Sequence, residues 1–447
     1  MADLIAWAER FIATPSESRL GNGAIASVAA ELLLELGLPA RIESALVAGT
    51  RHHAVICDVG PASGSDGLLL VTHLDTVPPG EHAAWTATGG DPFRPTRDGD
   101  RLYGLGSADA KVDFVCKAHA LAKVERARLR RPVRLIGTFG EEVGLIGARW
   151  LIERGLARGF RDALIGEPSE LCAVHAHKGY AVFEARVALE RLDTGGKKLA
   201  ISRVVRGVAA HSSAPSLGVN AILAALEELE SSDVLGVCAL AGGTAVNVVP
   251  DRCELGLVTT SAGEAFAGPA FERAPLLHFL AAWRRFDASL GARRDSAFDP
   301  DRTVASLGRV ALEDAHAVFR FDVRPIPGAD PDALASSLRA VAEVSCVRAN
   351  PPLATPRDAP LVRAVIDAQR AIGLSPRVAT KATCTEAGLF ARAGLSALVL
   401  GPGPSVGNVH KPNEHTRISE LHRAVELYSA LLERLVCLVC SRGTSCS

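Results

Sequence analysis

The stretch RPVRLIGTFGEEVGLIGARWLIERG, residues 131–155, decides the fold class. Its first part, RPVRLIGTF, is a nearly continuous apolar run, which is typical of a strand buried on both faces. Its last part, GARWLIERG, has the apolar spacing of a helix. The turn between them holds the adjacent glutamates Glu141 and Glu142. Such a pair is usually solvated in a loop, because glutamate is seldom buried, so the surrounding segments must show whether it has a function.

The alternation of strand and helix continues on both sides of this stretch. Apolar strands are predicted at 67–75, 133–140, 163–168 and 396–403, and helices at 24–37, 112–124, 361–373, 385–394 and 418–437. Continuous apolar strands separated by helices indicate a mostly parallel sheet covered on both faces. The predicted fold class is therefore α/β, with a mostly parallel sheet flanked by helices.

Polar side chains follow several of these strands where they end. His73 and Asp75 come after LLLVT, and Glu167 follows DALIG. Functional groups collect at the carboxyl ends of parallel strands. The candidate ligands are His73, Asp109 of GSADAK, Glu142, Glu167 and His410, which are two imidazoles among three carboxylates. Such a set suits zinc or a related divalent ion, and it suits two ions if one carboxylate bridges.

The order of predicted strands and helices changes in the middle of the chain. Residues 180–352 show the order strand, helix, strand, strand, helix, which suggests a smaller α+β domain inserted into the first. The expected domains are 1–179 with 353–447, and 180–352. Within the insert, about 260–302 reads as an extra helix with polar flanks. It separates two passages that resemble the halves of an interrupted hairpin.

Composition restricts the class of protein further. A chain of 447 residues is long enough for two domains. A net charge of -1 favours neither nucleic acid nor an anionic membrane as a partner. No run approaches the ~20 apolar residues of a membrane-spanning helix, and the N-terminus does not read as a secretory signal. The ten cysteines are mostly single, which suits reduced thiols in a cytoplasmic protein. We expect Cys437, Cys440 and Cys446 to belong to a frayed terminal helix.

Ordered motifs along nearly the whole chain resemble a known family. They include HLDTVPPG, GSADAK, GEEVGLIGAR, IGEPSEL, AHKGY, AHSSAPSLGVNAI, NVVPDRCEL, DVRPIPG, CTEAGLF and NVHKPNEH. The set is similar to the dizinc amidohydrolases and metallopeptidases that include acetylornithine deacetylase, succinyl-diaminopimelate desuccinylase, aminoacylase and glutamate carboxypeptidase. CTEAG and LGPG are most similar to acetylornithine deacetylase. The segment 260–302 is not covered by the resemblance.

The resemblance implies two zinc ions, which cobalt may replace, and a role for each ligand. Asp109 would bridge the ions, His73 and Glu167 would complete one site, and Glu142 and His410 would complete the other. Asp75 would orient the imidazole of His73. Glu141 would be the general base, because neighbouring side chains leaving a strand point in different directions.

The resemblance implies that the inserted domain acts as a lid and that it also mediates formation of a homodimer. His211 would stabilise the oxyanion in the site of the partner subunit. Asn247 and Arg324 would contact the substrate, since a guanidinium can hold a carboxylate through two hydrogen bonds. In the first domain, Gly388 would shape the backbone near the pocket.

The function implied is hydrolysis of the amide bond in N-acyl-L-amino acids such as N-acetylornithine, a step of arginine biosynthesis. A dipeptidase, carboxypeptidase or desuccinylase on the same metal platform is the alternative, because the motifs describe the bond cut better than the side chain recognised. A non-catalytic homologue that binds ligands is a remote alternative. The chain departs from the family at Val112, where glycine is usual and where a β-branched residue is expected to shift the start of the helix after Asp109.

Overall fold

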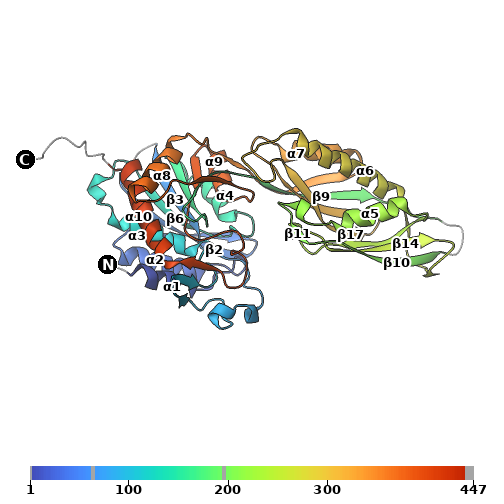
Figure 1. Ribbon diagram of the computed structural model, residues 1–447, viewed down its shortest axis with the longest axis horizontal. Coiled ribbons are helices and arrows are strands. Elements are labelled where there is room, and N and C mark those ends of the chain that lie inside the picture. The colour runs from blue at the N-terminus through green and yellow to red at the C-terminus, as the bar shows by residue number, and fades with distance from the viewer. Residues whose placement is uncertain (1–2, 62–65, 194–197, 438–447) are drawn as a thin grey trace, which may run out of the picture. The chain divides into compact units, whose positions relative to one another are not determined.

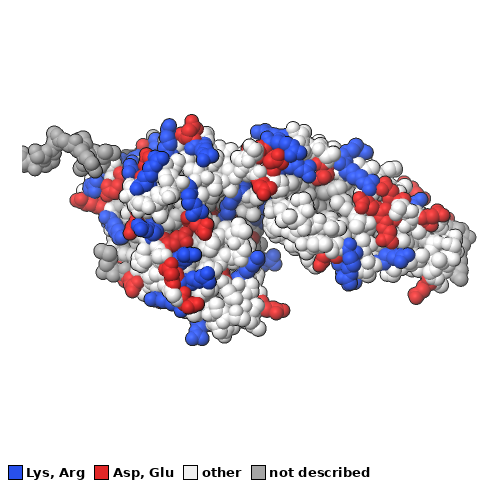
Figure 2. Space-filling view, viewed as in Figure 1, with Lys and Arg blue, Asp and Glu red and all other residues white. Residues whose placement is uncertain are grey.

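The computed structural model describes residues 3–61, 66–193 and 198–437. The chain forms two compact units (Figure 1). Unit 1 contains the residues up to Ala176, then Leu353–Thr380, and the residues from Thr385 onward; unit 2 contains His177–Pro352 and Lys381–Cys384. Lysine and arginine side chains are intermixed with aspartate and glutamate over the visible face of each unit (Figure 2), in keeping with the net charge of -1.

Unit 1 is built on one mixed sheet. Its strands lie side by side in the order β1 (Arg41–Val47), β2 (Thr50–Val59), β6 (Val133–Thr138), β3 (Gly67–His73), β7 (Phe160–Gly166), β22 (Ser396–Val399), β8 (Ala173–His177) and β20 (Leu353–Ala354). The central strands β6, β3, β7 and β22 are parallel. Strands β1 and β2 extend the sheet in antiparallel pairing. The predicted α/β class is confirmed, with a parallel centre and antiparallel additions at its edges.

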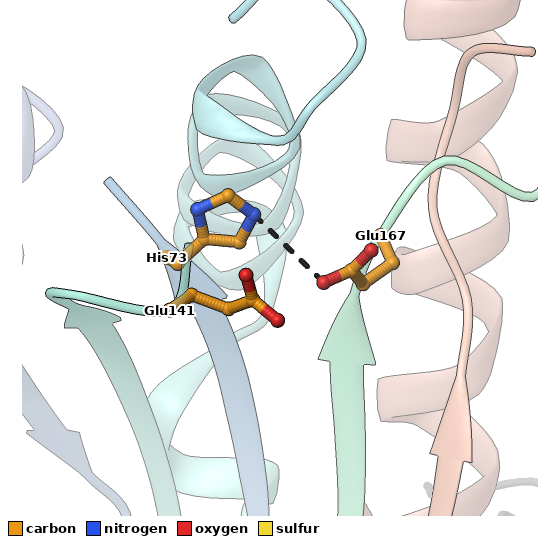
Figure 3. Close-up of side chains that lie close together, drawn as sticks. All are labelled: His73, Glu141 and Glu167. Carbon is orange, nitrogen blue, oxygen red and sulfur yellow. Dashed lines mark ion pairs between the residues drawn. The ribbon is translucent and has the colours of Figure 1, made fainter. Parts of the chain in front are cut away.

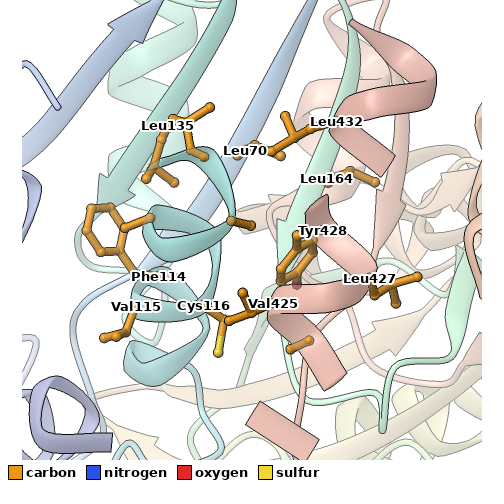
Figure 4. Packing of buried hydrophobic residues seen from close by; sticks show 14 of the residues in the cluster. Leu70, Phe114, Val115, Cys116, Leu135, Leu164, Val425, Leu427, Tyr428 and Leu432 are labelled. Carbon is orange, nitrogen blue, oxygen red and sulfur yellow. The ribbon is translucent and has the colours of Figure 1, made fainter. Parts of the chain in front are cut away.

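Both faces of this sheet are covered by helices. Along β3, Leu68 and Leu70 belong to one buried cluster and Leu69 and Val71 to another, as the alternation of a strand requires. The first cluster includes residues of α1 (Leu4–Ile12), α2 (Gly23–Glu35), α3 (Lys111–Lys123), α8 (Pro360–Ala371) and α10 (Ile418–Leu435). The second includes residues of α4 (Ile146–Glu153) and α9 (Ala387–Arg392). Figure 4 shows α3 and α10 packed together on the first face.

Helix α3 begins two residues after Asp109, at the point where the sequence departs from the family pattern. Val112 is fully buried in the unit 1 core. The helix starts at Lys111, one residue before it. The β-branched side chain is thus accommodated by packing in the core at the start of the helix.

Unit 2 is an antiparallel sheet with helices on one face (Figure 1). The strand order is β15 (Glu264–Ala265), β10 (Leu199–Arg206), β14 (Arg252–Thr259), β12 (Gly236–Gly242), β17 (Val304–Glu313), β18 (His316–Arg324), β9 (Tyr180–Ala188) and β19 (Glu343–Asn350). The helices are α5 (Ala221–Ser231), α6 (Ala274–Ser289) and α7 (Pro331–Ala335). Helix α7 is short, because it is followed by a 3-10 turn at Ser336–Ala340 that leads into β19.

The segment 260–302 is part of the unit 2 core. Helix α6 lies in it and buries Phe279, Trp283 and Phe286. The ring of Phe279 stacks on Phe319 with centroids 4.1 Å apart, and the ring of Trp283 meets Phe321 edge to face at 5.2 Å. Phe319 and Phe321 belong to β18, so the extra helix covers the central strands of the sheet.

The C-terminal helix α10 ends at Leu435, and Cys437 is buried. Cys440 and Cys446 lie outside the described residues. Within the ranges given above, no helix is both long enough and apolar enough to cross a membrane.

Candidate metal centre

The sheet of unit 1 brings the predicted ligands to one edge. His73 is the last residue of β3, Glu167 follows β7, and Glu141 and Glu142 lie on the turn after β6. Strand β3 pairs in parallel with both β6 and β7. His73 therefore lies between the two strands whose ends carry the glutamates.

The carboxylate of Asp109 faces two imidazoles at once. Its Oδ1 atom lies 3.0 Å from Nε2 of His73, and its Oδ2 atom lies 3.3 Å from Nε2 of His410. His410 belongs to the loop between β22 and β23 (His415–Arg417). Each oxygen of one carboxylate thus lies close to a different imidazole nitrogen, as a carboxylate shared by two metal ions would require.

The side-chain atoms that could contact metal ions form two groups. In the first, atoms of His73, Glu141 and Glu167 lie within 4.8 Å of one another; Figure 3 shows these side chains converging, with Nε2 of His73 3.8 Å from Oε1 of Glu167. In the second, atoms of Asp109, Glu142 and His410 lie equally close, with Nε2 of His410 3.0 Å from Oε1 of Glu142. Two glutamates that are adjacent in sequence therefore belong to different groups.

Asp75 supports both His73 and the glutamate turn. Nδ1 of His73 lies 3.0 Å from the backbone oxygen of Asp75 and 3.6 Å from its Oδ1. The backbone N–H groups of Glu141 and Glu142 donate to the Asp75 carboxylate at 3.3 and 3.4 Å, and the Ser18 hydroxyl donates to it at 2.6 Å. One buried residue thus supports the imidazole through its backbone oxygen and the turn through its carboxylate.

The electrostatics of the site favour added positive charge. Burial alone would lower the pKa of His410, but its hydrogen bonds to Asp109 and Glu142 outweigh burial and raise the pKa to about 11. Burial raises the pKa of Glu141 well above its ordinary value, and the charges of Glu167 and Glu142 raise it further. The carboxylates outnumber the imidazoles, and nitrogen and oxygen ligands of this kind suit divalent ions. The donor set therefore fits two metal ions that share Asp109.

Glu414 supports the loop that carries Asp109, a contact that was not predicted from the sequence. Its Oε1 atom accepts hydrogen bonds from the backbone N–H groups of Gly106, Ala108 and Asp109, at 3.1, 2.9 and 3.0 Å. The side chain is fully buried. Its place in the motif NVHKPNEH, four residues after His410, was the only signal in the sequence.

Glu386 is a second buried carboxylate near the site that was not predicted from the sequence. The hydroxyl of Thr138, the last residue of β6, donates to its Oε2 at 3.1 Å. Burial raises the pKa of Glu386 to about 8. The residue lies in CTEAG, two positions before Gly388, which is itself buried in the short helix α9. The available signal was again membership of a family-like motif.

The predicted residues of unit 2 gather around Ser212. His211 lies on the short strand β11 (Ala210–His211), and its Nδ1 is 2.7 Å from the Ser213 hydroxyl. The backbone N–H of Ser212 donates to the backbone oxygen of Asn247 at 3.1 Å. Arg324 donates to the Ser212 hydroxyl at 3.1 Å. The structure thus brings His211, Asn247 and Arg324 into one region.

Arg324 is almost completely buried. Only 5% of it is exposed. Its Nε donates to Asp322 at 3.0 Å, and the guanidinium lies 4.0 Å from the ring centre of Tyr180. One N–H group of the guanidinium is therefore already hydrogen-bonded to Asp322 in the interior of unit 2.

A cavity of about 330 Å³ opens in unit 1 beside the second ligand group. Its lining residues are Glu17, Ser18, Arg19, Val77, Pro78, Glu142 and Val143. Small-molecule sites have volumes of roughly 300 to 1,000 Å³, so this cavity has the size of a small substrate. Glu142 lines the cavity. Ser18, another lining residue, donates a hydrogen bond to the Asp75 carboxylate.

Comparison with known proteins agrees with this arrangement. Residues 69–434 match the model of peptidase family M20/M25/M40, and the chain belongs to this family. It is therefore an enzyme of the metallopeptidase and amidohydrolase class, which hydrolyses amide bonds, and the resemblance seen in the sequence motifs is confirmed.

Individual relatives differ in how much of the chain they cover. Acetylornithine deacetylase of Myxococcus xanthus is 29% identical over 399 residues, which cover 85% of this chain and 82% of that protein. Acetylornithine deacetylase of Salmonella paratyphi B is 36% identical over 220 residues, so the chain spans about half of its length (50%). Among solved structures, aminoacylhistidine dipeptidase of Vibrio alginolyticus has the same fold, with a TM-score of 0.68 over 96% of each chain at 18% identity.

Proposed function

We propose that this enzyme removes the acyl group from N-acyl-L-amino acids, with N-acetylornithine as the leading substrate and a role in arginine biosynthesis. The main support for this substrate class is the 29% identity to an acetylornithine deacetylase across 82% of that protein's length. The similarity to a dipeptidase structure is at 18% identity and concerns the fold.

Two zinc ions, replaceable by cobalt, are the proposed cofactors. Asp109 would lie between them, with His73 and Glu167 on one side and Glu142 and His410 on the other. The split of the Asp109 oxygens between two imidazoles supports this allocation. When bound, the ions would supply Lewis acidity, which polarises the scissile carbonyl and lowers the pKa of a nearby water.

Glu141 is the proposed general base. Its side chain lies with His73 and Glu167, while its backbone is fixed by Asp75. Its carboxylate would accept a proton from the attacking water and deliver it to the amide nitrogen as the C–N bond breaks. The products are a carboxylate from the acyl group and a free amino acid. Burial raises its pKa toward the working range of a residue that must both accept and donate a proton.

Unit 2 would supply the substrate contacts. His211 is an exposed imidazole held by Ser213, as an oxyanion donor to the partner subunit's site requires. Asn247 and Arg324 would contact the substrate near Ser212. Gly388 would shape the backbone near the metal ligands. A homodimer formed through unit 2 and a cytoplasmic location complete the proposal.

A substrate screen tests the proposed function. The protein is stripped of metal with a chelator, reloaded with Zn²⁺ or Co²⁺, and assayed for free amine released from N-acetylornithine, other N-acetyl amino acids, N-succinyl-diaminopimelate and a dipeptide panel. The proposal expects the highest kcat/KM with an N-acetyl amino acid. A preference for dipeptides would replace it with a dipeptidase, and no turnover with any of these compounds would favour a ligand-binding protein.

A further inference from the structure

A buried polar network lies beneath the metal-ligand groups. The Asp113 carboxylate, in the first turn of α3, is 2.7 Å from Nζ of Lys117 and accepts a hydrogen bond from the Thr72 hydroxyl at 2.6 Å. The Tyr428 hydroxyl donates to Asp113 as well. Figure 4 shows Tyr428 of α10 beside the turn of α3 that carries Phe114 and Cys116. The side chains of Asp113 and Lys117 have at most 1% exposure.

The second half of the network ties two strands together. Besides Asp113, the Lys117 ammonium donates to the backbone oxygen of Val71 at 2.8 Å, to the Thr72 hydroxyl at 3.1 Å and to the backbone oxygen of Leu164 at 3.3 Å. Val71 and Thr72 belong to β3 and Leu164 belongs to β7. Among the described residues, none of these side chains has a buried polar atom without a hydrogen-bond partner.

Asp113 contacts the residues that immediately precede two ligands. Thr72 precedes His73. Gly166 precedes Glu167, and a Cβ atom at Gly166 would lie 1.9 Å from Oδ2 of Asp113, so the carboxylate rests directly against that glycine. Asp113 itself lies on the helix that starts after Asp109. One carboxylate therefore joins the three segments that carry His73, Asp109 and Glu167.

Stability alone gives little reason for such a network. Replacing a buried ion pair by apolar residues of similar volume is often neutral or stabilising, because removing two charges from water is costly. A fully hydrogen-bonded polar network does, however, fix one arrangement of the elements that it connects. Sites that hold metal ions depend on such fixed geometry in the residues behind the ligands.

We infer that Asp113, with Thr72 and Lys117, is a positioning residue that sets the spacing of His73, Asp109 and Glu167. It acts through the backbone of these residues and does not contact the reacting atoms. The inference rests on the proposed function in one respect, which is that these residues bind metal. It goes further in assigning the network to the ion held by His73 and Glu167, because Asp113 directly contacts Thr72 and Gly166, which precede these two residues, whereas Asp109 would be shared by both ions.

Thr72→Val is the sharpest variant, because it removes the hydroxyl that joins Asp113 to β3 while keeping the side-chain volume. Thr72→Ser keeps the hydroxyl and is the matched control. Chelator-treated proteins are titrated with Co²⁺ by calorimetry and visible absorption. Wild type should show two binding steps. Thr72→Val should weaken one of them at least tenfold and leave the other within about threefold, and Thr72→Ser should match wild type in both.

A second variant separates positioning from folding. Asp113→Leu combined with Lys117→Met removes the buried charges together, and its thermal unfolding without metal should stay close to that of wild type. The same Co²⁺ step should nevertheless be weakened. Unchanged binding in both this variant and Thr72→Val, or equal weakening of both steps, would overturn the inference. A wild-type protein that binds fewer than two ions would instead contradict the proposed metal centre.

Discussion

The backbone nitrogen of Asp109 lies 3.0 Å from Oε1 of Glu414, a residue 305 positions later in the chain. The same oxygen accepts two further backbone hydrogen bonds from the loop that carries Asp109. The position of the proposed bridging ligand is therefore set by a side chain from the far end of the sequence.

Glu414→Ala should weaken metal binding by roughly 10- to 100-fold, the usual cost of losing a residue that supports a metal ligand. The physical reason is that three buried N–H groups lose their acceptor and the loop relaxes. Glu414→Gln keeps a carbonyl oxygen at the same place and should retain most of the affinity. Metal titration of the chelator-treated proteins measures both. Wild-type affinity in the alanine variant would show that the loop holds Asp109 without help.

Glu141→Gln and Glu142→Gln should separate catalysis from metal binding. Glu141→Gln should keep the metal content of wild type and lower kcat by about 10² to 10⁴, the range that general bases contribute. Glu142→Gln should lower the metal content, because Glu142 faces His410 in the second ligand group. Elemental analysis of the metal content and initial rates, measured on the same preparations, distinguish the two variants. Near-normal turnover of Glu141→Gln would exclude Glu141 as the general base.

Removal of metal should make stability depend on pH in a defined direction. The pKa of His410 is about 11 in the folded protein, against roughly 6.5 for an unfolded histidine. Its contribution to stability is complete below the unfolded pKa and is lost as the pH rises toward the folded value. The raised pKa values of Glu141 and Glu142, caused by burial, act in the same direction above about pH 4.5.

The Tm of the chelator-treated protein should therefore fall between pH 6 and pH 9. The metal-loaded protein should show a smaller slope, because bound cations replace the protons. Differential scanning fluorimetry of both forms across this range provides the measurement. Equal slopes would mean that these histidine and glutamate side chains do not dominate the pH response.

Trp283→Ala should destabilise unit 2 by about 3 to 5 kcal/mol, as expected for removing a buried tryptophan. Trp283 packs against Phe286 and Phe321 inside the core. Arg285, exposed on the same helix, is the control, and Arg285→Ala should change stability by about 0.5 kcal/mol or less. Urea unfolding compares the two. Deleting 260–302 should accordingly unfold unit 2, and a folded deletion variant would contradict the place of α6 in the core.

The parallel strands and their polar ends were predictable because both signals are local in the sequence. An apolar strand followed at once by His73 or Glu167 identifies the edge at which ligands collect. The family-like motifs then predicted different roles for Glu141 and Glu142, a distinction that their spacing alone could not provide. The antiparallel strands β1 and β2 were missed, since their outer positions mix polar and apolar residues.

Asp113 and Glu414 could not be assigned roles from the sequence, because their partners are remote. An acidic residue in the first turn of a helix is what the helix dipole favours anyway, so Asp113 looked ordinary. Its contact with Tyr428 spans 315 residues. Helix α6 was interpreted as an extra helix for the same reason. Its packing partner is β18, a strand that comes later in the chain.

The order of the ligands along the chain also sets the order in which they become available during synthesis. His410 leaves the ribosome 337 residues after His73. At 5 to 20 residues per second this interval is roughly 20 to 70 s. During that time the nascent chain can offer His73, Glu141 and Glu167 but not the second histidine. In the proposed metal centre, both ions could therefore be held together only after His410 has been translated.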